Sequence, residues 1–255
     1  MWATNLAILF LVSQLVMPIY RNPSGGAACG EDLSSDADLL LHLRLEESGA
    51  STRVDSSAAG NDMSVNGTIS QNTSLFKEGS ASNESAGGGT DGLERTDANL
   101  SSAFCGKAAC ADAAWGGWIQ FDTVSVNDTY FNKGANIRIQ MRSTGKLRCL
   151  TNDGQAEPAD SNSALSTATW YHVICQLDDA GDSLTMYLDG TAQTDVETVT
   201  GTMTTDTDPF RMFEESTGSN GSDGRMDEVF LFKRTLTAQE RDDIRTCGID
   251  GSGLP

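Results

Sequence analysis

Short alternations of apolar and polar residues run through the chain after residue 30, with Gly, Asn, Asp and Ser between them. This period of two is typical of half-buried β-strands. In DLLLHLRLEE, residues 38–47, the residues that would share one face are Leu39, Leu41, Leu43 and Leu45. WGGWIQFD, NIRIQMRS and KLRCLTN continue the series. The pattern predicts an all-β fold, and residues 38–248 read as the core of one domain.

The segment TWYHVICQLDDAGDSLTMYLDG, residues 169–190, predicts a hairpin. Two apolar strands flank DDAGD, whose residue types favour a turn. We therefore interpret Asp178, Asp179 and Asp182 as turn and solubilising residues. Asp189 and Gly190 would make the next tight turn.

One segment, LTAQERDDIRTCG at residues 236–248, predicts a helix. Thr237 and Glu240 have the spacing of a capping box, and Gly248 is a suitable stop. The helix would be short and would pack on the outside of the strands.

The first twenty residues carry no charged side chain, and 6–20 are nearly all apolar. Small residues follow, so the segment predicts an export signal cleaved near Ala28. The alternative is a retained helix that anchors the chain in a membrane or builds the core of an extracellular filament. The expected division is residues 1–28 as signal or anchor and 29–255 as the domain.

The formal net charge of −19 would repel nucleic acid and anionic lipid, which excludes nucleic-acid binding. The acidic residues are interspersed with Gly, Ser and Thr and are typical of a solvated surface. A secreted or cell-surface protein fits both this surface and the apolar leader.

Six cysteines form an even set in a chain that carries an export segment, which favours disulfides over metal ligands. Cys105 and Cys110 could close a small loop. Cys149 and Cys175 lie in two predicted neighbouring strands, and a bond between Cys29 and Cys247 would join the ends. This is one of fifteen possible connectivities.

Five segments in order resemble the laminin-G-like, concanavalin A-like jelly rolls of bacterial and archaeal surface proteins. They are residues 39–63, SLFKEGSAS, WGGWIQFD, the 169–190 hairpin and GRMDEVFLFKRTLTAQE. The resemblance covers about residues 38–248 and implies a two-sheet antiparallel sandwich with a short C-terminal helix. Because this fold hosts lectins, glycosidases and adhesion modules, function must be argued from sites.

Catalysis finds little support in the sequence. A retaining glycosidase needs two carboxylates about 5 Å apart, commonly on one strand face in a Glu-x-Asp-x-x-Glu run. That run does not occur, and a regular strand would put Asp227 and Glu228 on opposite faces. His172 lies mid-strand among aromatic residues and reads as structural. We therefore expect no enzyme, with glycoside hydrolysis as the third-ranked function.

The resemblance also implies a possible calcium site. Calcium prefers several oxygen ligands, and the loop RVDSSAAGND offers carboxylates and an amide. Carried over residue by residue, the family pattern suggests Asp55, Asn61 and Asp227 as ligands. Ala58 and Ala59 depart from the family's usual Gly-Asn at this loop.

Aromatic rings beside a concave sheet stack on sugars. Among the tryptophans, Trp118 and Trp170 alternate like core residues, whereas Trp115 precedes two glycines and is the candidate for a displayed, ligand-binding ring. The alternative is that Trp115 is a core residue as well. The sequence thus predicts a non-catalytic extracellular module that binds carbohydrate or extracellular protein, with or without calcium. The structural alternative is a homo-oligomeric or filament subunit that uses the N-terminal helix.

Overall fold

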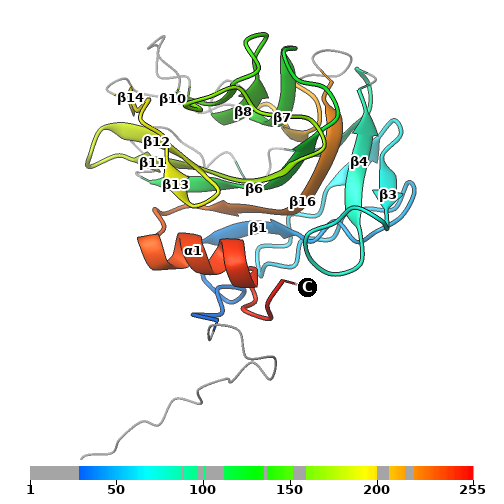
Figure 1. Cartoon of the computed structure of the whole chain (residues 1–255). Coiled ribbons are helices and arrows are strands. Elements are labelled where there is room, and N and C mark those ends of the chain that lie inside the picture. Colours follow the sequence, from blue (N-terminus) through cyan, green and yellow to red (C-terminus); the bar gives the residue numbers. More distant parts are fainter. Residues whose placement is uncertain are drawn as a thin grey trace, which may run out of the picture.

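The computed structural model describes residues 29–87, 89–96, 100, 112–134, 137–151, 159–199, 207–215 and 221–254. Two antiparallel sheets lie face to face, and a single described helix covers the outer face of one of them (Figure 1). This is the predicted all-β sandwich with one short C-terminal helix.

The first sheet carries the helix and contains nine described strands. Its path runs β13 (Thr191–Ala192), β12 (Ser183–Leu188), β11 (Trp170–Asp178), β6 (Ala113–Phe121), β16 (Asp223–Phe232), β4 (Ser82–Ala86) and β3 (Ser70–Asn72). Two more strands of this sheet pair with strands already named: β1 (Leu39–Leu43) pairs with β16, and β14 (Glu197–Thr198) pairs with β12.

The second sheet contains seven described strands. Its order is β10 (Ala159–Asp160), β9 (Leu147–Thr151), β8 (Ile137–Met141), β7 (Asp128–Lys133), β15 (Phe210–Met212), β5 (Gly92–Arg95) and β2 (Ser64–Asn66). Consecutive strands β2 and β3 therefore end up at the edges of different sheets, and the chain crosses between the layers there.

The main core fills the space between the sheets. Its largest members are fully buried aromatic residues: Trp115, Phe121, Tyr130, Phe131, Phe210 and Phe213. Each fully buried large apolar side chain contributes roughly 1.5–3 kcal/mol, so this layer supplies the main driving force for folding.

Strand β1 follows the predicted alternation for most of its length. Leu41, Leu43 and Leu45 face the inter-sheet core. Leu39 does not join them, because the pairing with β16 shifts between Leu39 and Leu41. Leu39 instead packs in a second cluster on the outer face of the sheet.

The predicted hairpin is formed by β11 and β12, which pair in unbroken register. Asp178 accepts a hydrogen bond from the Gly181 amide, and Asp182 adopts a positive φ of 50°. Asp189 also has positive φ, and its carboxylate accepts from the His172 amide. These acidic residues form turns, as the sequence led us to expect.

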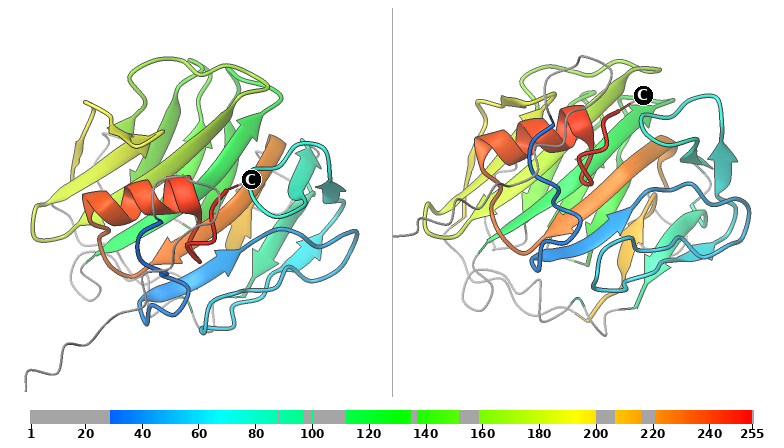
Figure 2. Two further views of the ribbon diagram at one scale, coloured as in Figure 1. Left: turned by 60° about the horizontal axis from the view of Figure 1, so that its bottom comes forward. Right: turned by 90° about the horizontal axis from the view of Figure 1, so that it is seen from below.

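Helix α1 (Ala238–Cys247) lies across the outer face of the first sheet (Figure 2). Thr237 and Glu240 make the predicted capping box in both directions, and Gly248 ends the helix with positive φ. The helix covers the second apolar cluster, whose members include Phe230, Phe232 and Ile244. The expectation of an external, capped helix is confirmed.

Two disulfides lie in the described part of the chain. Cys149–Cys175 links a strand of one sheet to a strand of the other, and Cys29–Cys247 joins the N-terminal segment to the end of α1. These are the pairs proposed from the sequence. Cys105 and Cys110 lie outside the described residues.

The predicted signal or anchor, residues 1–28, also lies outside the described residues. Within the ranges that are described, no helix has both the length and the apolar character needed to cross a bilayer.

Candidate functional site

Trp115 is not a displayed ring. It is fully buried between the sheets, and its neighbours in β6 are buried too. The two glycines that suggested an exposed position serve packing instead: a Cβ on Gly116 would lie 1.9 Å from the Val173 carbonyl oxygen. The neighbouring strand crowds this part of β6, and Trp115 therefore cannot stack on a sugar.

A β-bulge interrupts β16 opposite the second glycine. The register with β6 shifts between Asp227 and Phe230, and Glu228 has a φ of 47°. Gly117 fits this irregular backbone, with its own φ at 154°. The prediction that Asp227 and Glu228 occupy opposite faces assumed an unbroken strand, and the bulge removes that assumption. Bulges commonly re-aim side chains in this way.

The bulge helps to build a buried acid cluster, which we define as Glu78, Asp227, Glu228 and Asp250 with His42 and Arg44. His42 Nε2 lies 2.6 Å from Glu228 Oε2, and both side chains are at most 5% exposed. Arg44 reaches three carboxylates at 3.5–3.7 Å: Glu78, Glu228 and Asp250. Arg44 is the only arginine or lysine among the six residues.

Glu78 is the least compensated member of the acid cluster. Its side chain is 3% exposed, and both carboxyl oxygens lack a hydrogen-bond partner. The tail after α1 closes over it, since a Cβ on Gly248 would lie 2.3 Å from Glu78 Oε2. Asp227 is better satisfied, because it accepts from the amides of Lys77, Glu78 and Glu228.

Burial controls the protonation of these groups. Burial and the charge of Glu228 raise the pKa of Glu78 to about 8. Burial raises the pKa of Asp227 to about 8, although a hydrogen bond from the Lys77 amide lowers it. Burial also raises the pKa of Glu228 to about 8, although the charge of Arg44 lowers it. Burial lowers the pKa of His42 to about 4. Burial thus favours an uncharged imidazole and a protonated carboxyl in the His42–Glu228 pair.

Perturbed carboxyls often mark catalytic sites, but these lie beneath the C-terminal tail. Glu78, Asp227 and Glu228 are at most 4% exposed. A substrate cannot touch them in this conformation. In this structure the acid cluster ties strands β1 and β16 to the tail.

The proposed calcium ligands are engaged by protein donors. The two oxygens of Asp55 accept from the amides of His42, Ser57 and Asn61 and from the Ser57 hydroxyl. Asn61 donates to the Leu40 carbonyl, and only its Oδ1 is left without a partner. The acceptor positions that a cation would use on Asp55 are therefore filled.

Asp227 likewise faces backbone amides, whose positive ends disfavour a nearby cation. Among the described residues, no three His, Cys, Asp or Glu side chains are grouped so that they could hold a metal ion. As they stand, Asp55, Asn61 and Asp227 do not fit calcium. A calcium site here stays a prediction from the resemblance and requires some of these hydrogen bonds to break.

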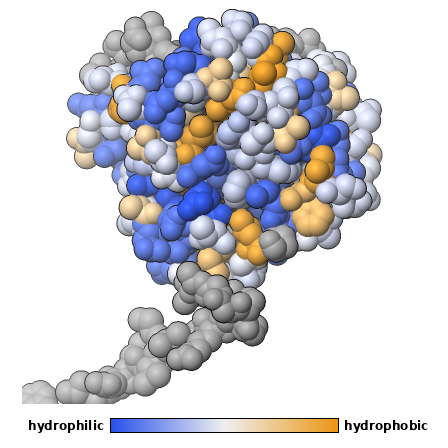
Figure 3. Space-filling model, in the orientation of Figure 1, coloured by the Kyte–Doolittle hydropathy of each residue, from blue (hydrophilic) through white to orange (hydrophobic). Residues whose placement is uncertain are grey.

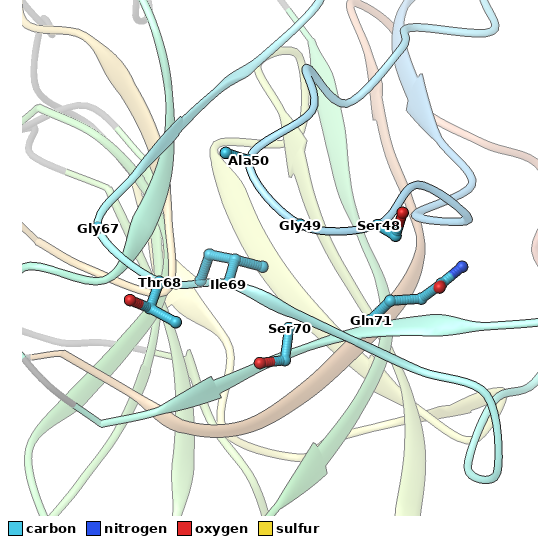
Figure 4. Close-up of a pocket in the computed structure, with 8 residues that line it drawn as sticks. All are labelled: Ser48, Gly49, Ala50, Gly67, Thr68, Ile69, Ser70 and Gln71. Carbon is cyan, nitrogen blue, oxygen red and sulfur yellow. The ribbon is translucent and has the colours of Figure 1, made fainter.

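A further candidate site, which no sequence motif marks, is a surface pocket that we call the edge pocket. It has a volume of about 550 Å³ and lies where the chain crosses from β2 to β3 (Figure 4). A loop at 48–50 faces the segment 67–71 across it. The lining residues are uncharged, and all except Ile69 are small or polar: Ser48, Gly49, Ala50, Gly67, Thr68, Ile69, Ser70 and Gln71.

Buried side chains hold the loop of the edge pocket in place. The Arg53 guanidinium donates to the carbonyls of Gly49 and Ser51, although Arg53 itself is fully buried. Asn83 donates to the Leu45 carbonyl, and Gln71 donates to the Glu46 carbonyl. A pocket wall fixed from behind loses little conformational freedom when a ligand binds, which favours affinity.

The opposite wall is fixed by its backbone. Gly67 has a φ of 72°, and a Cβ there would lie 2.3 Å from the Thr90 carbonyl oxygen, so only glycine fits. The next amide, of Thr68, donates to the Asp91 carboxylate. Ile69 is buried in the core, whereas Thr68 and Ser70 are exposed at the pocket.

Elsewhere the visible surface is mostly hydrophilic, and its apolar residues form narrow streaks (Figure 3). The large apolar side chains that are more than a third exposed in the described part are isolated in sequence: Val54, Leu75, Val126 and Val196. The pocket is therefore a better candidate for ligand binding than a broad apolar surface.

Comparison with known proteins agrees with this architecture. The family described as the concanavalin A-like lectin/glucanases superfamily matches residues 87–240, more than half of the chain. The chain belongs to this superfamily. No curated protein matches the sequence.

Several solved structures share the fold at low sequence identity. The binding domain of Paraclostridial Mosquitocidal Protein 1 has a TM-score of 0.63 at 14% identity, over 82% of this chain and 52% of that one. The receptor binding domain of botulinum neurotoxin C/D mosaic serotype gives 0.61 at 13% identity, covering 82% and 51%. Trypanosoma rangeli sialidase gives 0.60 at 16%, covering 90% and 35%. The chain thus spans about half of the toxin domains and a third of the sialidase.

Proposed function

We propose that this lectin-like domain is a non-catalytic extracellular binding module, and that the edge pocket is its ligand site. The observation that carries the proposal is an uncharged pocket of about 550 Å³ whose walls are held by buried hydrogen-bonding groups. Ligand sites are concave and largely preformed, and a few placed polar groups give them specificity. The edge pocket is concave and held from behind, and its hydroxyl and amide groups suit a ligand rich in hydroxyl groups.

The fold supports a binding role. Two of the similar structures are a binding domain and a receptor binding domain, and the disulfides and the lectin-like fold suit an extracellular protein. Hydrolysis has weaker support, because the acid-cluster carboxyls Glu78, Asp227 and Glu228 are buried and no carboxyl belongs to the pocket lining. The pocket itself contains no acid or nucleophile pair, so it offers no group for glycoside cleavage.

The test is a screen of the domain 29–255 on a glycan array, followed by titration calorimetry of the hits. Ala50→Trp, which places a large ring in the pocket, is expected to weaken binding at least about tenfold, or about 1.4 kcal/mol. Ala58→Trp, at an exposed loop outside the lining, is the matched control and should bind like the parent protein.

Two further results would contradict the proposal. Turnover of a β-glucan panel that a single carboxylate substitution abolishes would establish an enzyme. Assembly into filaments that requires residues 1–28, without any ligand for the domain, would establish the structural alternative.

A further inference from the structure

We infer that the edge pocket selects uncharged, hydroxyl-rich glycans and rejects sialylated or sulfated ones. The inference rests on the proposed function of the pocket and adds the chemical class of its ligand. It is not what the structural neighbours suggest, since several of them are sialidases.

The pocket lacks the groups that bind an anion. None of its eight lining residues is Lys, Arg or His. Recognition of a carboxylate or sulfate commonly uses the guanidinium of Arg, with paired N–H donors, or the ammonium of Lys. The one guanidinium behind the loop, Arg53, is fully buried and donates to Gly49, Ser51 and Asn83. It is therefore not presented to a ligand.

The charges around the pocket oppose an anion. The carboxylate of Asp91 lies against the far wall, 2.8 Å from the Thr68 amide nitrogen. On the loop side, the Glu47 carboxylate accepts from the Val54 amide, and Glu46 accepts from Ser80. The chain as a whole carries −19. An anionic sugar would approach like charges without gaining an ion pair.

The pocket does offer what sugar hydroxyls need. Ser48, Thr68 and Ser70 supply hydroxyls that both donate and accept, and Gln71 supplies an amide oxygen. β3 is an edge strand, so part of its backbone N–H and C=O groups point away from β4. With only three residues, β3 is too short to favour pairing with an extended peptide strand, which is the competing occupant.

The experiment compares matched neutral, sialylated and sulfated glycans of the same core, bound to the domain 29–255 at about 50 and about 500 mM NaCl. We expect binding of neutral glycans only, at least about tenfold tighter than the anionic forms, with little change in affinity between the two salt concentrations. Ser70→Ala and Thr68→Val should weaken this binding, whereas Ala58→Trp should not.

The experiment distinguishes failure of the charge selectivity from failure of the proposed function. If neither neutral nor anionic glycans bind, or if an extended peptide binds at β3 instead, both the ligand class and the carbohydrate function are overturned. If anionic glycans bind as well as neutral ones and Ala50→Trp abolishes both, the proposed function survives and the charge selectivity is overturned. If neutral glycans bind Ala50→Trp unchanged, the edge pocket is not their site, which overturns the inference.

Discussion

Neutralising Glu78 should stabilise the domain at neutral pH. Burial and Glu228 raise the pKa of Glu78 from 4.5 to about 8, so the folded protein holds a proton that the unfolded chain has released. Between these two values stability falls as pH rises, because the folded state binds more protons than the unfolded state. The substitution E78Q removes this proton requirement and keeps the side-chain shape.

The size of the effect follows from the pKa. One pKa unit corresponds to about 1.4 kcal/mol, so at pH 7, which is above the ordinary pKa of 4.5 and below the raised pKa of about 8, protonating Glu78 costs at most roughly 3 kcal/mol. The new amide must also find partners among Arg44, Glu228 and Asp250, which lowers the gain. We expect E78Q to be about 1–3 kcal/mol more stable at pH 7 and about equal to the parent near pH 4.5.

The assay is urea unfolding of the oxidised domain from about pH 4.5 to about pH 8. Other carboxyls, such as the fully buried Glu214, also have raised pKa values, so the pH dependence of the parent protein alone cannot be assigned to Glu78. The difference in unfolding free energy between E78Q and the parent isolates the contribution of Glu78. Glu31→Gln, at an exposed site, is the control. A loss of stability in E78Q that is the same at every pH would show that Glu78 is ionised and paired with Arg44, refuting the reasoning.

Three more outcomes are expected. Millimolar calcium should leave the thermal unfolding of the domain unchanged, because protein donors fill the oxygens of Asp55 and Asp227; a stabilisation that disappears in both Asp55→Ala and Asp227→Ala would restore the predicted site. Trp115→Ala should cost about 3–5 kcal/mol of stability in a denaturant titration, and a cost below about 1 kcal/mol would contradict its place in the core. Thr237→Ala should cost about 1 kcal/mol through loss of the helix cap, whereas Thr246→Ala in the last turn has no N-terminal cap to lose and serves as the comparison.

The strands, the hairpin and the capped helix were predictable because each depends on local chemistry. Alternation in 39–45 and the capping box at Thr237 need no knowledge of distant contacts. The position of Leu39 was not predictable, since it depends on a register shift against β16. Such shifts are set by pairing between segments nearly two hundred residues apart.

The sites were harder to predict for the same reason. Two consecutive glycines, Gly116 and Gly117, are compatible with an unusual backbone in β6. The sequence does not show that the paired strand β16 contains a bulge opposite them. The burial of Glu78 depends on a tail that closes over it from the other end of the chain. The edge pocket consists of Ser, Thr, Gly and Gln, which are common throughout this sequence, so only the fold distinguishes them.

The disulfide at the N-terminal side of the domain determines where residues 1–28 would be attached. Because Cys29 is bonded to Cys247, whatever precedes Cys29 joins the domain at the end of α1, on the outer face of that sheet. The helix lies over β11 and β12, where Arg241 covers the Tyr187 ring. β3, which contributes Ser70 and Gln71 to the edge pocket, is the last strand in the order of this sheet, whereas β12 and β11 lie near its other end. Both a cleaved form that begins near Cys29 and a form that keeps residues 1–28 would contain the whole edge pocket, because its lining begins at Ser48. The proposed ligand test on residues 29–255 therefore applies to either form.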